Sequence, residues 1–189
     1  EEFDRAARAY SELSTSSPNH WREQELLLWV QVEIYIGQRN YKEAKELLTT
    51  YANLESSRPD TTLKTDFRHK LGYILFLEGN TGEGLRLINE DIALHKRAIQ
   101  PNQPRYYHAC LYQFNLAAMY SILNQSEKAL HHLDSAFLQE SYRVERNPMF
   151  DNLRKHPEFQ QLYKRKQRHW QLNQAAMKQA LREFEAGTL

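Results

Sequence analysis

Residues 116–136 read LAAMYSILNQSEKALHHLDSA, with apolar side chains three and four positions apart on both sides of a short polar break. Residues at these spacings share one face of a helix, so the pattern is typical of amphipathic helices. The break at residues 124–126 carries the residue types that favour helix ends and turns. The segment is therefore predicted to form two antiparallel helices joined by a tight turn.

The same arrangement occurs twice more upstream. Helix pairs are predicted over residues 21–54, 60–99 and 104–138, and no stretch shows the two-residue alternation of a half-buried strand. In each pair the second helix is expected to start at an Asn that is followed three residues later by Glu, which suits the positive end of the helix dipole. These starts are Asn40 with Glu43, Asn80 with Glu83, and Asn124 with Glu127.

A small residue follows each of these helix starts. Two antiparallel helices need a small side chain where their backbones come closest. The sequence places Ala44, Gly84 and Ala129 at this position in the three pairs.

Length and composition limit the fold classes that the chain can adopt. The chain has 189 residues, and Lys+Arg 25 against Asp+Glu 24 leaves a formal net charge of +1, so neither disorder nor a polyanion-binding composition is indicated. The sequence contains only six glycines and six prolines, and this disfavours collagen-like and most all-β folds, which draw heavily on these two residues. The single cysteine cannot form an internal disulfide, which favours a reducing compartment. We expect the cytoplasm, with the periplasm left open.

The ends of the sequence and its apolar stretches complete this outline. The longest mostly apolar stretch, residues 71–77, is far short of the roughly 20 residues that cross a bilayer. The chain begins within an apparent helix, so we expect a further portion upstream.

The repeated spacing resembles that of the tetratricopeptide repeat. The third pair carries the likeness best, with residues at the family's characteristic positions: Leu116, Ala117, Tyr120, Ala129, Leu133 and Ala136. The resemblance implies an all-α, right-handed superhelix of helix pairs with a C-terminal capping helix. The expected divisions of this single domain are a partial repeat at 1–18, helix pairs at 19–59, 60–101 and 102–147, and a terminal cap with a long helix at 148–189. The small residues lie 40 and 45 positions apart rather than about 34, so each second helix is expected to be lengthened.

Residues 147–159 resemble the segment that ends many bacterial tetratricopeptide domains of signalling and transcription-regulating proteins. We expect a short helical turn whose apolar side chains cover the last face of the stack, namely Met149, Phe150, Leu153 and Phe159. One long helix is then expected over residues 160–185, ending at Gly187.

No residue pattern indicates catalysis, so we expect no catalytic, cofactor-binding or metal-binding residues. The glycine-rich run at 79–84 lacks the Lys-Ser/Thr of a phosphate loop and is expected to be a turn between helices. The histidines, including His95 and the adjacent His131 and His132, are expected at the solvent or at edges rather than around a metal. Cys110 is expected to be a buried, inert thiol.

The function expected from the resemblance is protein–protein interaction, as the partner-sensing or scaffolding part of a larger bacterial regulatory protein. The first helices of such pairs line a concave groove, whose lining in this chain is expected to be mainly aromatic and apolar. The groove residues expected to bind a partner are Trp29, Glu33, His69, Lys70, Tyr73, Phe114, Asn115 and Ser121, and the family's inner positions also include Leu26, Asp66, Leu111 and Ala118. A protein or peptide with an apolar helix or extended segment is the expected partner.

Two alternatives are kept. The basic run at residues 164–169 could contact a nucleic acid, although a solvated helix face is the simpler interpretation. The terminal helix could also serve homo-oligomerisation, or fold back and fill the groove.

Overall fold

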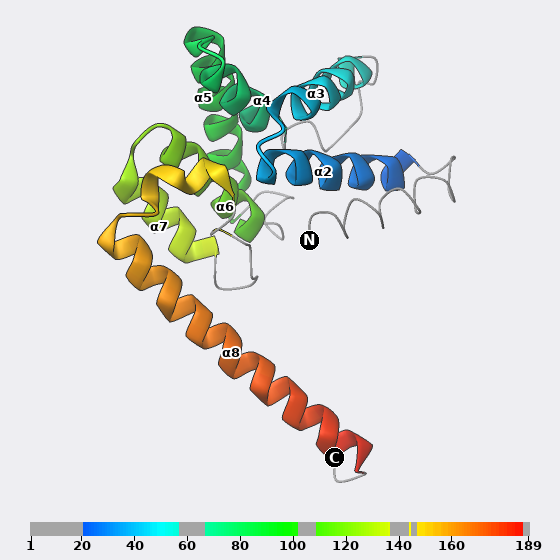
Figure 1. Cartoon of the computed structure of the whole chain (residues 1–189), viewed down its shortest axis with the longest axis vertical. Helices are drawn as coiled ribbons and strands as arrows, with labels where there is room; N and C mark the ends of the chain where they lie inside the picture. Colours follow the sequence, from blue (N-terminus) through cyan, green and yellow to red (C-terminus); the bar gives the residue numbers. More distant parts are fainter. Residues whose placement is uncertain (1–20, 57–66, 102–108, 137–143, 145–146, 187–189) are drawn as a thin grey trace. The chain divides into compact units, whose positions relative to one another are not determined.

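The computed structural model describes residues 21–56, 67–101, 109–136, 144 and 147–186. Every regular element in these ranges is helical, which confirms the all-α class (Figure 1). The partial repeat expected at 1–18, Asp66 and Gly187 lie outside the described residues. No helix in the described ranges combines the length and the apolar character that crossing a membrane requires.

The chain divides into two compact units. The first comprises residues 1–97 with 146–149, and the second comprises residues 98–145 with 150–189. Each unit is described by itself below.

Four helices make up the described part of the first unit. These are α2 (Trp21–Gly37), α3 (Tyr41–Ser56), α4 (Arg68–Leu77) and α5 (Thr81–Ala98). They correspond to the first two predicted pairs, and the turn between the two helices of each pair lies at its predicted position.

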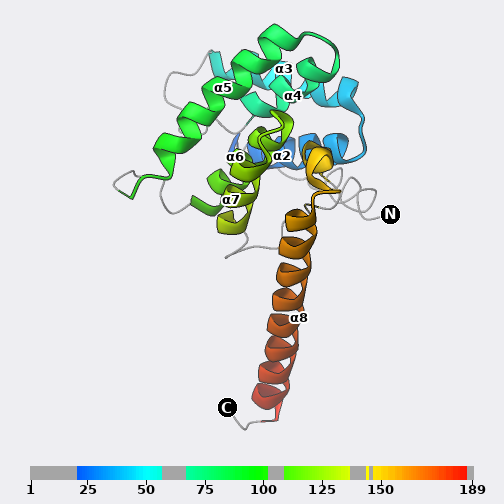
Figure 2. The ribbon, with the colours of Figure 1, turned by 90° about the vertical axis from the view of Figure 1, so that its left-hand side faces the viewer.

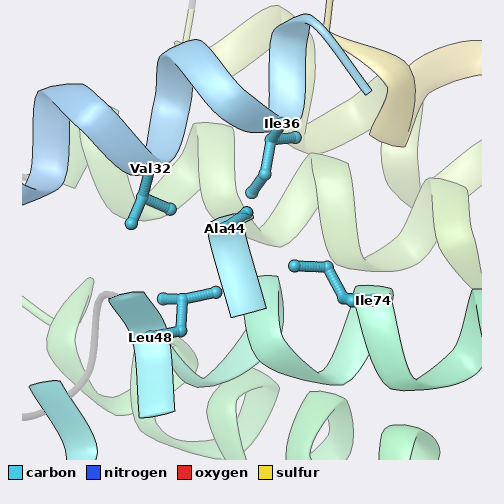
Figure 3. Close-up of a cluster of buried hydrophobic side chains, with 5 residues drawn as sticks. All are labelled: Val32, Ile36, Ala44, Leu48 and Ile74. Carbon is cyan, nitrogen blue, oxygen red and sulfur yellow. The ribbon is translucent and has the colours of Figure 1, made fainter. Parts of the chain in front are cut away.

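The core of this unit joins three of its helices. Val32 and Ile36 of α2, Ala44 and Leu48 of α3, and Ile74 of α4 are fully or almost fully buried and point toward one another (Figure 3). Burying such side chains contributes roughly 1.5–3 kcal/mol for each large aliphatic residue. Ala44, predicted from the sequence as a close-approach position, is inside this cluster.

The second unit contains the third predicted pair. Its helices are α6 (Ala109–Ile122) and α7 (Ser126–Ala136), followed by the long helix α8 (Pro157–Glu185), drawn in orange to red (Figure 2). A 3-10 helix, η2 (Pro148–Leu153), begins in the residues assigned to the first unit and ends in the second, and it confirms the short helical turn expected before α8. Leu116 and Ala117 of α6 and Ala129 and Leu133 of α7 are buried.

The cap side chains expected around η2 are buried, as predicted from the sequence. They are Met149, Phe150, Leu153 and Phe159. Helix α8 begins three residues before the predicted start, at Pro157, because proline fits the first turn of a helix, where no backbone N–H is needed.

The three helix pairs close through the same backbone turn. The residue at the turn has positive φ in each case: 63° at Arg39, 86° at Gly79 and 56° at Asn124. The next residue donates its N–H five residues back, at 2.8 Å from Asn40 to Tyr35, 2.9 Å from Asn80 to Leu75 and 2.9 Å from Gln125 to Tyr120. This is the Schellman ending of a helix, in which a left-handed residue lets the chain satisfy the last carbonyls.

The turn corrects one prediction. Asn124 does not start the third helix as Asn40 and Asn80 start theirs, because it occupies the left-handed position that Arg39 and Gly79 occupy. The carbonyl of Gln125 instead accepts the first helical hydrogen bond, from Ala129 at 3.0 Å. Asn tolerates the left-handed region well, and this favours it over Gln at the turn itself.

The glycine-rich run is an inter-helix turn, as predicted, and it brings two backbones into contact. A Cβ atom added at Gly84 would lie 2.7 Å from the carbonyl oxygen of Gly72, and one added at Gly72 would lie 2.8 Å from that of Gly84. Helices α4 and α5 therefore need glycine at both positions.

Candidate functional site

The groove residues predicted in the first unit lie on α2 and α4. Trp29 and Glu33 are half-buried on α2, whereas His69, Lys70 and Tyr73 are buried on α4. Lys70 contacts Trp29 and Glu33, and the hydroxyl of Tyr73 lies 3.4 Å from that of Tyr41.

Lys70 is the largest fully buried side chain of the described residues, with 2% of its surface exposed. Its ammonium lies 2.7 Å from Glu33 Oε1 and within 5.6 Å of the centres of the Trp29 and Phe67 rings. A buried ammonium needs such a partner because its desolvation is costly. Lys70 therefore ties α4 to α2 inside the first unit.

The groove residues predicted in the second unit are all buried on α6. Phe114 packs at 5.3 Å between ring centres against Phe150, and the carbonyl of Ser121 accepts a hydrogen bond of 3.1 Å from the side chain of Asn152. Asn115 is likewise buried. Six of the eight predicted groove residues are thus interior residues of their own unit, and contact between this set and a partner stays a prediction.

A polar cluster that no sequence pattern indicated lies between α4 and α5. Its members, His69, Asp91 and His95, are fully buried. Asp91 Oδ2 accepts the backbone N–H of His69 at 3.1 Å and the ring Nδ1–H of the same residue at 2.7 Å. His95 Nδ1 donates to the carbonyl of Asp91 at 2.9 Å and lies 3.3 Å from Asp91 Oδ1.

The electrostatics of the cluster follow from its burial. Burial lowers the pKa of His69 below its ordinary value, with a smaller opposing effect of the bond to Asp91, so this imidazole is neutral at pH 7. Burial alone would raise the pKa of Asp91, but the combined interactions with His69 and His95 outweigh it and lower that pKa. Asp91 is therefore a buried carboxylate anion.

The location of His95 corrects the expectation of solvent-exposed or edge histidines. His131 is exposed and His132 is half-buried, but His69 and His95 are interior residues. The sequence feature that could have indicated the cluster is the four-residue spacing of Asp91 and His95, which places both on one face of α5. Their meeting with His69, 22 residues before Asp91, depends on the packing of two helices.

Cys110 also differs from its prediction. It is only half-buried, near the start of α6, rather than an interior thiol.

An uncovered apolar stripe runs along the second half of α8. Met177, Leu181 and Phe184 follow one another at spacings of four and three and expose 71%, 57% and 70% of their surfaces. At the other end of the same helix face, Phe159 is buried. The stripe therefore continues a packing face into solvent.

The basic run at 164–169 is partly engaged within the second unit. Arg165 and Lys166 lie 2.8 Å and 3.2 Å from Asp134 Oδ1 on α7. These ion pairs attach the first half of α8 to α7.

Comparisons with known proteins identify no relative of the chain. No family model matches it, and neither a curated protein nor a solved structure is significantly similar to it.

Proposed function

We propose that this chain is a non-catalytic protein–protein interaction module whose contacting element is the second half of α8. The observation that carries the proposal is the exposure of Met177, Leu181 and Phe184 on one helix face. Large apolar side chains gathered on a surface are favourable to bury and commonly mark an interaction site.

The occupant that we propose is an amphipathic helix of a partner protein. Spacings of three and four residues present a narrow apolar ridge, which suits packing against the corresponding ridge of another helix. The same face already packs within the second unit at Phe159 and Leu162, which are buried. A partner helix would extend this packing along α8.

The repeat architecture and the larger protein to which the module belongs are also proposals. The three identical turns support an array of repeated helix pairs, and the resemblance to tetratricopeptide repeats adds the right-handed superhelix. A place in a larger bacterial regulatory protein rests on the likeness of residues 147–159 to the ends of such domains.

Self-association through the same stripe is a second candidate. Tyr163, Trp170, Met177 and Phe184 recur every seven residues, which is the repeat of a coiled-coil seam. Nucleic-acid contact is not proposed, because two cations of the basic run are already paired with Asp134.

Two matched double variants test the proposal. Met177→Glu with Leu181→Glu charges the stripe, and Ala175→Glu with Gln179→Glu places the same two charges, at the same spacing, on the opposite face. Proteins retained from a bacterial lysate by immobilised wild type and variants are identified, and each candidate is purified and titrated against all three by calorimetry. We expect a partner that binds wild type and the control variant, with affinity at least about 10-fold weaker for the stripe variant.

Light scattering separates the two candidates. A wild-type mass of two chains that falls to one chain only in the stripe variant assigns the stripe to self-association. A single-chain mass throughout, with the same proteins retained by all three, contradicts both candidates.

A further inference from the structure

We propose that His69, Asp91 and His95 form a structural binding site for one divalent transition-metal ion, with Zn²⁺ as the best-suited ion, which ties α4 to α5. This site is independent of the α8 surface and goes beyond the proposed interaction function.

Burial of a carboxyl group between two imidazole rings is the first feature that points to an ion. Asp91 is fully buried, and among the described residues its contacts at ion-pair distance are with the rings of His69 and His95. A carboxylate in such a place is costly unless a cation balances it, and a metal ion bound at Asp91 would supply that cation.

The donor atoms of the cluster lie close together. One ligand atom from each of the three residues lies within 4.8 Å of those of the other two. Ligands held about 2.0–2.2 Å from a common Zn²⁺ lie about 3.0–3.4 Å apart, so side-chain rotations that move these atoms slightly closer would bring them to an ion.

Hydrogen bonding fixes which ring nitrogen of His69 can bind an ion. Asp91 Oδ2 accepts hydrogen bonds, so the His69 ring carries its proton at Nδ1 and its lone pair at Nε2. Among the described residues, that buried Nε2 and Asp91 Oδ1 have no hydrogen-bond partner. A carboxylate bonded to one ring nitrogen is the arrangement that orients histidine ligands in metal sites.

The donor set selects the class of ion. Two imidazole nitrogens and one carboxylate suit Zn²⁺ and its neighbours in the first transition series, whereas Mg²⁺ prefers an all-oxygen shell. Because the three residues are buried, the ion would be enclosed as the protein folds, and its role would be structural.

The experiment uses the full chain without a histidine tag. The protein is unfolded with EDTA, refolded with ZnCl₂, MgCl₂ or no metal, and separated from free ions by gel filtration. We expect about one Zn²⁺ per chain by mass spectrometry of the metal, and a melting temperature that rises with Zn²⁺ but not with Mg²⁺. A folded wild-type protein that retains no Zn²⁺ overturns the proposal and identifies the cluster as a hydrogen-bonded network, balanced by a proton.

Variants assign the ligands. Asp91→Asn and His95→Gln are expected to weaken Zn²⁺ binding on the order of 100-fold or more, whereas His131→Gln, at an exposed histidine, retains wild-type affinity. Equal retention by all variants places the ion elsewhere and overturns the proposal.

X-ray absorption of the Zn²⁺-loaded wild type makes the test independent of variant folding. Two imidazole ligands in a shell of nitrogen and oxygen atoms support the site. A sulfur ligand, which would implicate Cys110, or a shell without imidazole contradicts it.

Discussion

At the scale of single residues, a carboxylate from α5 supplies the cap that α4 lacks. The N-cap residue of α4, Phe67, makes no side-chain hydrogen bond. Asp91 Oδ2 accepts the free N–H of His69, in the first turn of the helix, and places a negative charge at the positive end of the helix dipole. Asp91 therefore joins two helices through a group that either helix alone would leave unsatisfied.

Gly84 provides a test of the close approach between α4 and α5. Gly84→Ala is expected to destabilise the protein by about 1–3 kcal/mol, because the new Cβ would lie 2.7 Å from the carbonyl oxygen of Gly72. Gly82→Ala is the matched control on the same helix, because its Cβ meets nothing within 4 Å. The control should be neutral or stabilise by about 0.5–1 kcal/mol. Urea denaturation measures both, and equal effects would contradict the close approach.

The buried ammonium of Lys70 makes a second residue-level prediction. Glu33→Gln is expected to cost about 1.5–3 kcal/mol, because the buried charge of Lys70 loses its carboxylate. Lys70→Met should cost less, since it removes the charge and keeps an apolar stem. Glu78→Gln breaks the exposed pair with Lys45 and should change stability by about 1 kcal/mol or less. Chemical denaturation measures the loss of folding stability in each variant. A larger loss for Lys70→Met than for Glu33→Gln would contradict the explanation by an uncompensated buried charge.

Residue-level features were only partly predictable from the sequence. Gly84 was identified because a small residue recurs at one position of each helix pair. The cluster around Asp91 was missed because no local pattern pairs residues 69 and 91, which meet only through packing. Likewise, the predicted groove residue Lys70 is recognisable as a charge in the sequence, but its burial is not.

At the scale of the elements, the helix pairs were predictable because their signals are local. The apolar spacing, the polar breaks and the small residues lie within a few positions of the turns that they specify. The third helix start was misplaced by one residue, because Asn favours both a helix start and a left-handed turn. The backbone hydrogen bonds, which cannot be read from the sequence, show that Asn124 lies in the turn and does not start the helix.

The attachment of α8 to α7 makes a pH prediction. Partial burial opposes the ionisation of Asp134, but the bonds from Arg165 and Lys166 together outweigh it and lower its pKa from 3.8. A carboxyl with a lowered pKa in the folded state stabilises above its unfolded pKa and loses this effect as the pH falls through the folded value. Wild-type stability should therefore fall more than that of Asp134→Asn below about pH 4.

The measurement is the melting temperature of both proteins from about pH 6 to about pH 3, at low and high salt. Glu158→Gln, which removes a carboxylate from α8 itself, is the control. We expect a small difference that high salt reduces, because Asp134 is half exposed. Identical acid dependence of wild type and Asp134→Asn at low salt would show that the ion pairs do not hold α8.

At the scale of the whole molecule, burial is unevenly distributed along the chain. Nine consecutive residues of α6, from Phe114 to Ile122, are buried, whereas the side chains described beyond Lys166 in α8 are mostly exposed. Segments with few buried contacts open locally at low free-energy cost.

Hydrogen exchange tests this distribution. Backbone amides of α6 should exchange slowest, and those of the second half of α8 should exchange at least about 100-fold faster, because little packing opposes their opening. Mass spectrometry of peptides from the intact protein gives the rates. Equal protection of the two helices would mean that the α8 stripe is covered in solution.

The repeated turn has a consequence for how such a chain can change in length. Each of the three helix pairs in the described residues closes with backbone bonds between its own residues around one left-handed residue, at Arg39, Gly79 and Asn124. A duplicated or deleted stretch of some forty residues would bring or remove its closing chemistry intact. The chain could therefore gain or lose a helix pair without needing a new connecting loop.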